Sequence, residues 1–104
     1  MAAYVRVAKL SEVPPGTVKP VEANGVGIAL CNVGGTVYAL RDECTHEAFP
    51  LSAGELEGAV LTCPLHGAQF DVRTGRVRAL PATVPVQTYP VRVEGEDIYV
   101  AVEP

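Results

Sequence analysis

The chain has no run of about eighteen apolar residues, so none of it is long enough to cross a membrane as a helix. Its N-terminus, Met1-Ala2-Ala3-Tyr4-Val5-Arg6, lacks the basic start and apolar stretch of a signal peptide. Positive charge is also scarce: eight basic residues stand against twelve acidic ones, with no basic cluster to follow a phosphate backbone. We therefore expect a cytoplasmic protein that binds neither membranes nor nucleic acid.

Cysteine is scarce as well. Three cysteines cannot form a fully paired disulfide framework, and two of them lie in a pattern typical of metal ligands, which indicates a reducing compartment. The third, Cys31, ends the apolar run Ile28-Ala29-Leu30-Cys31. We predict that it is a small buried core residue rather than a reactive thiol.

Helical periodicity is absent. Ten glycines and nine prolines are spread over 104 residues, and no window longer than about ten residues keeps a 3.6-residue period. Period-two alternation occurs instead at residues 5–8, 36–40 and 98–102, with an acidic glycine turn at 94–97. These patterns predict a single all-β domain over residues 1–104, a sandwich or barrel with roughly eight to ten short strands. A short helix or turn is expected only at 47–53.

What the chain does contain is one four-residue constellation. Cys44-Thr45-His46 and Cys63-Pro64-Leu65-His66 use both histidines and two of the three cysteines. Each arm follows a predicted strand, at 36–41 and 58–62, and offers one thiolate and one imidazole to a metal. Pro64 should stiffen the second arm, and Gly67 should permit a positive φ beside the metal.

Two kinds of metal centre could use these ligands. A structural zinc site with two Cys and two His is one, but zinc arms usually pair cysteine with cysteine and histidine with histidine. Here each arm is mixed, which fits two metals better. If Cys44 and Cys63 bind one iron and His46 and His66 bind the other, each loop contributes to both ends of a [2Fe–2S] centre.

The sequence resembles the Rieske-type ferredoxins in these arms and in the residues around them. The match covers Cys44-Thr45-His46, Leu51-Ser52-x-Gly54-x-Leu56-x-Gly58, Cys63-Pro64-Leu65-His66-Gly67-Ala68-x-Phe70-Asp71 and Thr74-Gly75. The resemblance implies one Rieske [2Fe–2S] cluster on the four ligands and three stacked antiparallel sheets. It also implies a cluster-binding subdomain at about residues 42–80, inserted into a β base.

Departures from related families narrow the function. Respiratory Rieske proteins carry an extra cysteine in each loop, and the matching positions here are Phe49 and Leu65, so that disulfide cannot form. They also place hydroxyl donors near the cluster, where this chain has Ala68 and Phe70. Fewer hydrogen bonds to the cluster imply a low potential for a Rieske centre, near about −150 mV.

The resemblance implies an electron carrier rather than an enzyme. A Rieske oxygenase needs a second iron on two further histidines, and both histidines are already used. No G-x-G-x-x-G segment is present for a flavin or nicotinamide. We expect a monomer that passes electrons from a flavin-dependent reductase to a terminal oxygenase through transient contacts. The alternatives are a small subunit of an assimilatory nitrite reductase, a ferredoxin of a di-iron aromatic monooxygenase, and a structural zinc domain.

Other polar and proline-rich segments receive simpler interpretations. Asp71 is expected to cap the turn that ends at Gly75. The stretch 80–85 should be a rigid surface segment that could border the metal loops. Glu43 and Glu47 flank the first arm as solvated charges that could shape a docking surface.

Overall fold

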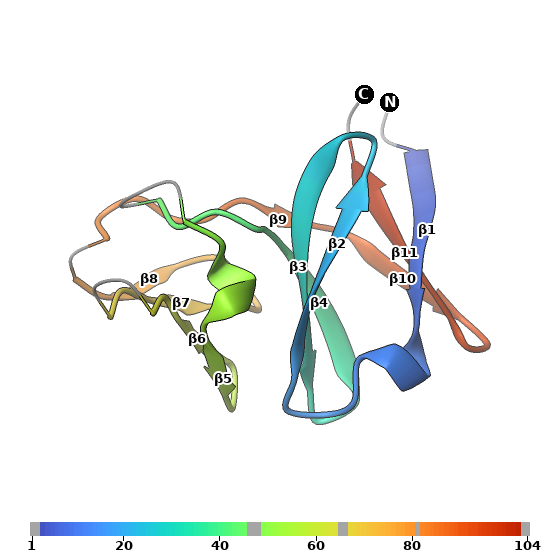
Figure 1. Cartoon of the computed structure of the whole chain (residues 1–104), viewed down its shortest axis with the longest axis horizontal. Helices are drawn as coiled ribbons and strands as arrows, with labels where there is room; N and C mark the ends of the chain where they lie inside the picture. Colours follow the sequence, from blue (N-terminus) through green and yellow to red (C-terminus); the bar gives the residue numbers. More distant parts are fainter. Residues whose placement is uncertain (1–2, 46–48, 65–66, 81, 103–104) are drawn as a thin grey trace.

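The computed structural model describes residues 3–45, 49–64, 67–80 and 82–102, and these form eleven strands and two 3-10 turns (Figure 1). The strands are β1 (Ala3–Lys9), β2 (Val18–Ala23), β3 (Val26–Val33), β4 (Thr36–Arg41), β5 (Glu55–Glu57), β6 (Val60–Thr62), β7 (Gln69–Asp71), β8 (Val77–Ala79), β9 (Thr88–Tyr89), β10 (Val91–Glu94) and β11 (Asp97–Val102). The turns are η1 (Leu10–Glu12) and η2 (Leu51–Ala53). The predicted all-β class is confirmed, with one strand more than the expected range.

The strands form three antiparallel sheets, as the family resemblance implied. Their strand orders are β1-β11-β10, β2-β3-β4-β9 and β5-β6-β7-β8. Figure 1 shows the β5–β8 sheet at one end of the long axis, the β2–β3–β4 strands in the middle and the β1–β11–β10 sheet at the other end. We call the first of these the cluster sheet and the other two together the base.

The middle sheet serves two cores, because its strands β3 and β4 present successive side chains to opposite faces. Leu30 and Ala39 belong to a hydrophobic cluster with residues of β1 and β11. Their chain neighbours Cys31 and Leu40 belong to a second cluster with residues of β6 and β7. The middle sheet therefore packs against the β1-β11-β10 sheet on one face and against the cluster sheet on the other, through buried side chains.

Cys31 is buried, with 0% of its surface exposed, which confirms its predicted role as a core residue. Burial raises the pKa of its thiol to about 12, and the negative charge of Asp42 acts in the same direction. The thiol is therefore protonated and unreactive at neutral pH.

The cluster sheet is inserted between two neighbouring strands of the base. The chain leaves the middle sheet at the end of β4 and returns as β9, which pairs with β4 through Ala39 and Tyr89. The N–H of Arg41 donates to the carbonyl of Gln87 at 2.9 Å, just where the two segments separate. Entry and exit of the inserted segment therefore lie side by side.

One local prediction needs correction. The strand expected at 58–62 begins only at Val60, because Gly58 and Ala59 form the two-residue loop between Glu57 and Val60 and Gly58 has φ +59°. The short helix or turn expected at 47–53 is found as η2, a single 3-10 turn at 51–53, and residues 47–48 lie outside the described residues. Pro50, at φ −62° and ψ 122°, precedes that turn in an extended conformation.

Candidate metal centre

The first arm follows β4 and is closed by its own backbone. The N–H of Cys44 donates to the carbonyl of Phe49 at 2.8 Å, so the two described ends of the arm are bonded to one another. Cys44 is buried, with 4% of its surface exposed. It belongs to the same group of packed apolar side chains as buried residues of β6 and β7. Two positions before Cys44, the carboxylate of Asp42 accepts two hydrogen bonds from Ser52. The backbone N–H and the hydroxyl of Ser52 donate one each, both at 2.7 Å.

The second arm is the tip of the β6–β7 hairpin. The N–H of Cys63 donates to the carbonyl of Ala68 at 2.7 Å, and the N–H of Gly67 donates to the carbonyl of Cys63 at 3.1 Å. Gly67 has φ +79°, as its predicted role requires. Cys63 is 2% exposed and lies in the same hydrophobic cluster as Cys44.

The two arms are built alike, which matters for the metal they could hold. In each arm the cysteine N–H bonds to the carbonyl five residues later, so the arm is a short closed loop that begins at a buried sulfur. Both sulfurs belong to one cluster of apolar side chains. Two buried thiols in one apolar cluster fit an iron–sulfur cluster, which is held by thiolates in a dry and hydrogen-bonded environment.

Half of the predicted ligand set cannot be placed. His46 and His66 lie outside the described residues, as do Glu47 and Leu65. Within residues 3–45, 49–64, 67–80 and 82–102, no group of three or more His, Cys, Asp or Glu side chains could hold a metal ion. The structure thus places the two cysteines and their loops, while the two histidines remain predictions from the sequence.

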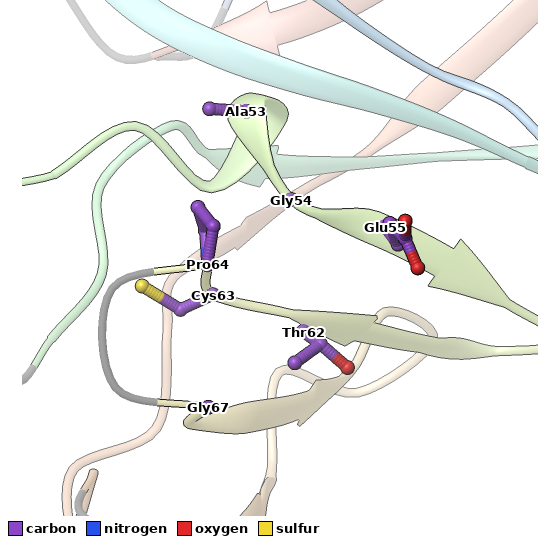
Figure 2. Close-up of a pocket in the computed structure, with 7 residues that line it drawn as sticks. All are labelled: Ala53, Gly54, Glu55, Thr62, Cys63, Pro64 and Gly67. Carbon is purple, nitrogen blue, oxygen red and sulfur yellow. The ribbon is translucent and has the colours of Figure 1, made fainter.

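A pocket of about 360 Å³ adjoins the second arm. Its wall consists of residues 53–55 on one side and residues 62–64 with Gly67 on the other (Figure 2). Figure 2 shows the Cys63 sulfur directed away from Glu55 and Thr62, which lie at the strand end of the pocket. The pocket therefore lies between the η2–β5 segment and the second ligand arm.

Residues 82–88, which we call the strap, connect the cluster sheet back to the base and touch the first arm. The hydroxyl of Thr45 donates to the carbonyl of Val84 at 2.6 Å. The N–H of Val86 donates to the carbonyl of Gly75 at 2.9 Å. The expectation that the proline-rich segment could border the metal loops is confirmed for the first arm.

The turn beneath the strap is organised by Asp71, as predicted. Its backbone carbonyl accepts the N–H of Gly75 at 2.7 Å, and its carboxylate accepts the N–H of Arg73 at 2.9 Å. The Arg73 guanidinium bonds both carboxylate oxygens, at 3.2 and 3.0 Å, and holds the pKa of Asp71 below its usual value. A depressed pKa means that Asp71 stabilises the turn above its unfolded-state pKa, and that this contribution is lost as the pH falls through the folded-state pKa.

Ala68 and Phe70, the positions where high-potential relatives carry hydroxyl groups, are buried in the same cluster as the two cysteines. Neither side chain can donate a hydrogen bond to a sulfur. A donor there would favour the reduced state, which carries one extra negative charge. With Ala68 and Phe70 at these positions, we expect a low potential for a Rieske centre.

Ala68→Ser and Phe70→Tyr are expected to raise the reduction potential, by roughly 60 mV per donor if each new bond contributes about 1.5 kcal/mol to the reduced form. Protein-film voltammetry on the two single variants and the double variant measures this shift, with the visible spectrum as the check that the cluster is intact. Unchanged or lower potentials would show that neither side chain faces the cluster.

The sequence did not reveal the contacts that hold the arms. Ser52 belongs to the family-like pattern around Leu51 and Gly54, but nothing in the sequence indicates that Asp42 is its hydrogen-bond partner. Thr45 is recognisable only as the residue between two predicted ligands, and its bond to Val84 spans 39 positions. A polar residue at each end of a ligand loop is the only sequence signal, and it is a weak one.

Comparison with known proteins identifies the family. The Rieske [2Fe–2S] domain family matches residues 3–90. The ferredoxin component of biphenyl 2,3-dioxygenase from Rhodococcus jostii (strain RHA1) is 42% identical over 101 residues, which is 97% of this chain and 94% of that protein.

Solved structures agree. The ferredoxin of carbazole 1,9a-dioxygenase from Nocardioides aromaticivorans IC177 superposes with a TM-score of 0.93 at 37% identity, over 97% of this chain and 99% of that one. A chain in the complex of reduced oxygenase and oxidized ferredoxin of carbazole 1,9a-dioxygenase gives 0.89 at 39% identity, over 94% and 92%. The chain therefore belongs to the Rieske [2Fe–2S] domain family, and its cofactor is one Rieske-type [2Fe–2S] cluster.

Proposed function

We propose that this chain is the ferredoxin component of a ring-hydroxylating dioxygenase system and carries single electrons from a flavin-dependent reductase to the terminal oxygenase. The observation that carries the proposal is the likeness, over nearly the whole chain, to ferredoxin components named for such dioxygenases. The likeness to a chain in a complex of oxygenase and ferredoxin supports the oxygenase as one partner. The reductase is the partner that the chain's lack of a flavin site requires.

In this proposal Cys44 and Cys63 bind one iron, and His46 and His66 bind the other. Two findings support it: the cysteines are buried in one apolar cluster, and the backbone N–H of each cysteine is bonded to a carbonyl five residues later, beyond the histidine of its arm in the sequence. When bound, such a cluster accepts and releases one electron at a potential above the roughly −400 mV of plant-type ferredoxins. The chain's own part is to hold the loops, exclude water from the sulfurs and supply few hydrogen-bond donors.

The alternatives differ in how well they agree with these findings. The family match argues against a zinc domain, because the family is that of the Rieske [2Fe–2S] domain. A nitrite reductase subunit and a ferredoxin of a di-iron monooxygenase are less well supported, since the similar proteins are named as dioxygenase components.

We propose further that residues 42–80 form the cluster-binding subdomain, and that the chain is a cytoplasmic monomer. No helix in the described residues is long and apolar enough to span a membrane.

A carrier must meet two partners in turn, so its contacts should be small, below about 1,200 Å² in total. The surface next to the first arm suits such contacts. Val84, whose carbonyl is bonded to Thr45, has 57% of its surface exposed, and Leu80, four residues earlier in the chain, has 74%. Exposed apolar side chains beside a redox site are typical of a docking surface.

Reconstitution tests the proposed function. The purified protein is expected to contain about two irons and two acid-labile sulfides and to accept one electron. Mixed with the flavin reductase and the dioxygenase of its own organism, it should make aromatic substrate turnover depend on its concentration. The matched control is the Cys63→Ala variant, which should supply the polypeptide without an intact cluster. Turnover that proceeds equally well without the protein would show that the assigned role is wrong.

A further inference from the structure

Asp42 lies at the junction between the base and the first ligand arm. It follows the last residue of β4, and its N–H donates to the carbonyl of Gly27 on β3 at 2.9 Å. Its carboxylate then reaches Ser52 in η2, where Oδ1 accepts the backbone N–H and Oδ2 accepts the hydroxyl, both at 2.7 Å. These two bonds join positions ten residues apart, and the first arm, with Cys44 and His46, lies between them.

The two arms differ in the contacts that join the segment before each arm to the segment after it. The second arm stands on a β-ladder, because β6 and β7 pair through Thr62 and Gln69 directly below it. The first arm stands on β4 and η2, which do not pair as strands. The two Asp42–Ser52 bonds take the place of the missing ladder.

The turn that Ser52 occupies also touches the second arm. A Cβ placed on Gly54 would lie 1.8 Å from the carbonyl oxygen of Thr62, so the backbone at 54 is in direct contact with the residue before Cys63. Only glycine allows this approach. Residues 52–54 therefore contact Asp42, which precedes the first arm, and Thr62, which precedes the second arm.

We propose that Asp42 is a positioning residue for the cluster ligands: by fixing Ser52, its carboxylate sets the placement of the two ligand arms relative to one another. The proposal rests on the ligand set of the proposed function. It assigns Asp42 no contact with the cluster. The bonds between Asp42 and Ser52 are expected to limit how much the distance between the two arms varies. The arrangement of the ligands should therefore be the same in the oxidised and the reduced state of the [2Fe–2S] cluster.

The test uses the purified holoprotein and four variants. Asp42→Ala removes both bonds, Ser52→Ala removes only the hydroxyl bond without changing charge, and Asp42→Asn keeps an acceptor for the Ser52 N–H together with a donor toward its hydroxyl. Glu43→Ala is the matched control. It removes a negative charge beside the same arm, from a half-exposed carboxylate whose ion pair with Arg41 is long at 4.0 Å.

Two properties are measured on each: the rate at which a chelator removes iron from the cluster, and the width of the EPR signal of the reduced cluster. Asp42→Ala should lose iron about tenfold faster and Ser52→Ala about threefold faster, from the usual net strength of two hydrogen bonds and of one. Both should broaden the EPR signal. Asp42→Asn and Glu43→Ala should stay within about twofold of the parent, with the parent's line width. Faster amide exchange at Ser52 in Asp42→Ala would confirm that the turn has been released.

The outcomes separate this proposal from the proposed function. If the parent protein shows no Rieske EPR signal, the ligand assignment itself fails. If the parent signal is present and Asp42→Ala behaves like Glu43→Ala, only the positioning role is wrong. If Asp42→Asn is as impaired as Asp42→Ala, the charge acts and the bond geometry does not, which also overturns the proposal. Should Asp42→Ala fail to fold, Ser52→Ala decides by the same two measurements.

Discussion

Cys63→Ala is expected to yield protein without the red-brown colour of a [2Fe–2S] cluster and with less than about a tenth of the parent's iron, because an iron that loses one of two thiolates is no longer held. His66→Ala should have the same effect, since it removes an imidazole from the other iron. Iron and acid-labile sulfide analysis, with the visible spectrum, measures both.

The chain offers a closely matched control for this experiment. Cys31 is a second buried cysteine in the same hydrophobic cluster, at 0% exposure against 2% for Cys63. Cys31→Ala therefore removes the same atoms from a comparable environment without removing a proposed ligand. It should keep the full iron content and unfold with a free energy lower by about 1 kcal/mol. Equal iron loss in the two variants would mean that packing, and not ligation, explains the result.

Gly75→Ala is expected to lower the free energy of unfolding by about 3 kcal/mol. Two causes act together. Gly75 has φ +80°, where a residue with a side chain is strained, and an added Cβ would lie 2.2 Å from the carbonyl oxygen of Val86 in the strap. The melting temperature should fall by about 15 °C in a domain of this size, as measured by circular dichroism.

Gly95→Ala separates these two causes. Gly95 also has a positive φ, +63°, but no atom lies within 4 Å of an added Cβ. This variant should therefore lose only about 1 kcal/mol, the cost of the backbone conformation alone. If the two variants melted at the same temperature, the close approach between the turn and the strap would carry no energetic weight.

The parts of this structure that could be predicted from sequence are those with a local signal. The strand Thr36–Arg41 follows a Gly34-Gly35 pair and alternates in period two, so both its position and its turn could be read directly. The ligand arms could be recognised because their chemistry depends on cysteine and histidine at close spacing. The start of β6 was misplaced because Gly58-Ala59-Val60 is apolar and continuous, and only the turn geometry shows where the strand begins.

Contacts between distant segments left no such signal. The Asp42–Ser52 and Thr45–Val84 bonds join residues that no periodicity relates, and any exposed aspartate or threonine looks the same in sequence. The pairing of β9 with β4 was equally hidden. It depends on where the inserted cluster sheet returns to the base, which is a property of the whole fold.

The pairing of β1 with β11 has a practical consequence for engineering. Ala3 lies opposite Val102 in that ladder, and Figure 1 shows the start of β1 and the end of β11 together at the edge of the base, away from the β5–β8 sheet. A linker attached near either end would leave from the base and would not pass over the ligand arms. Reductase domains or electrode anchors could therefore be fused at either end, with the electron-exchanging tip still free to meet a partner.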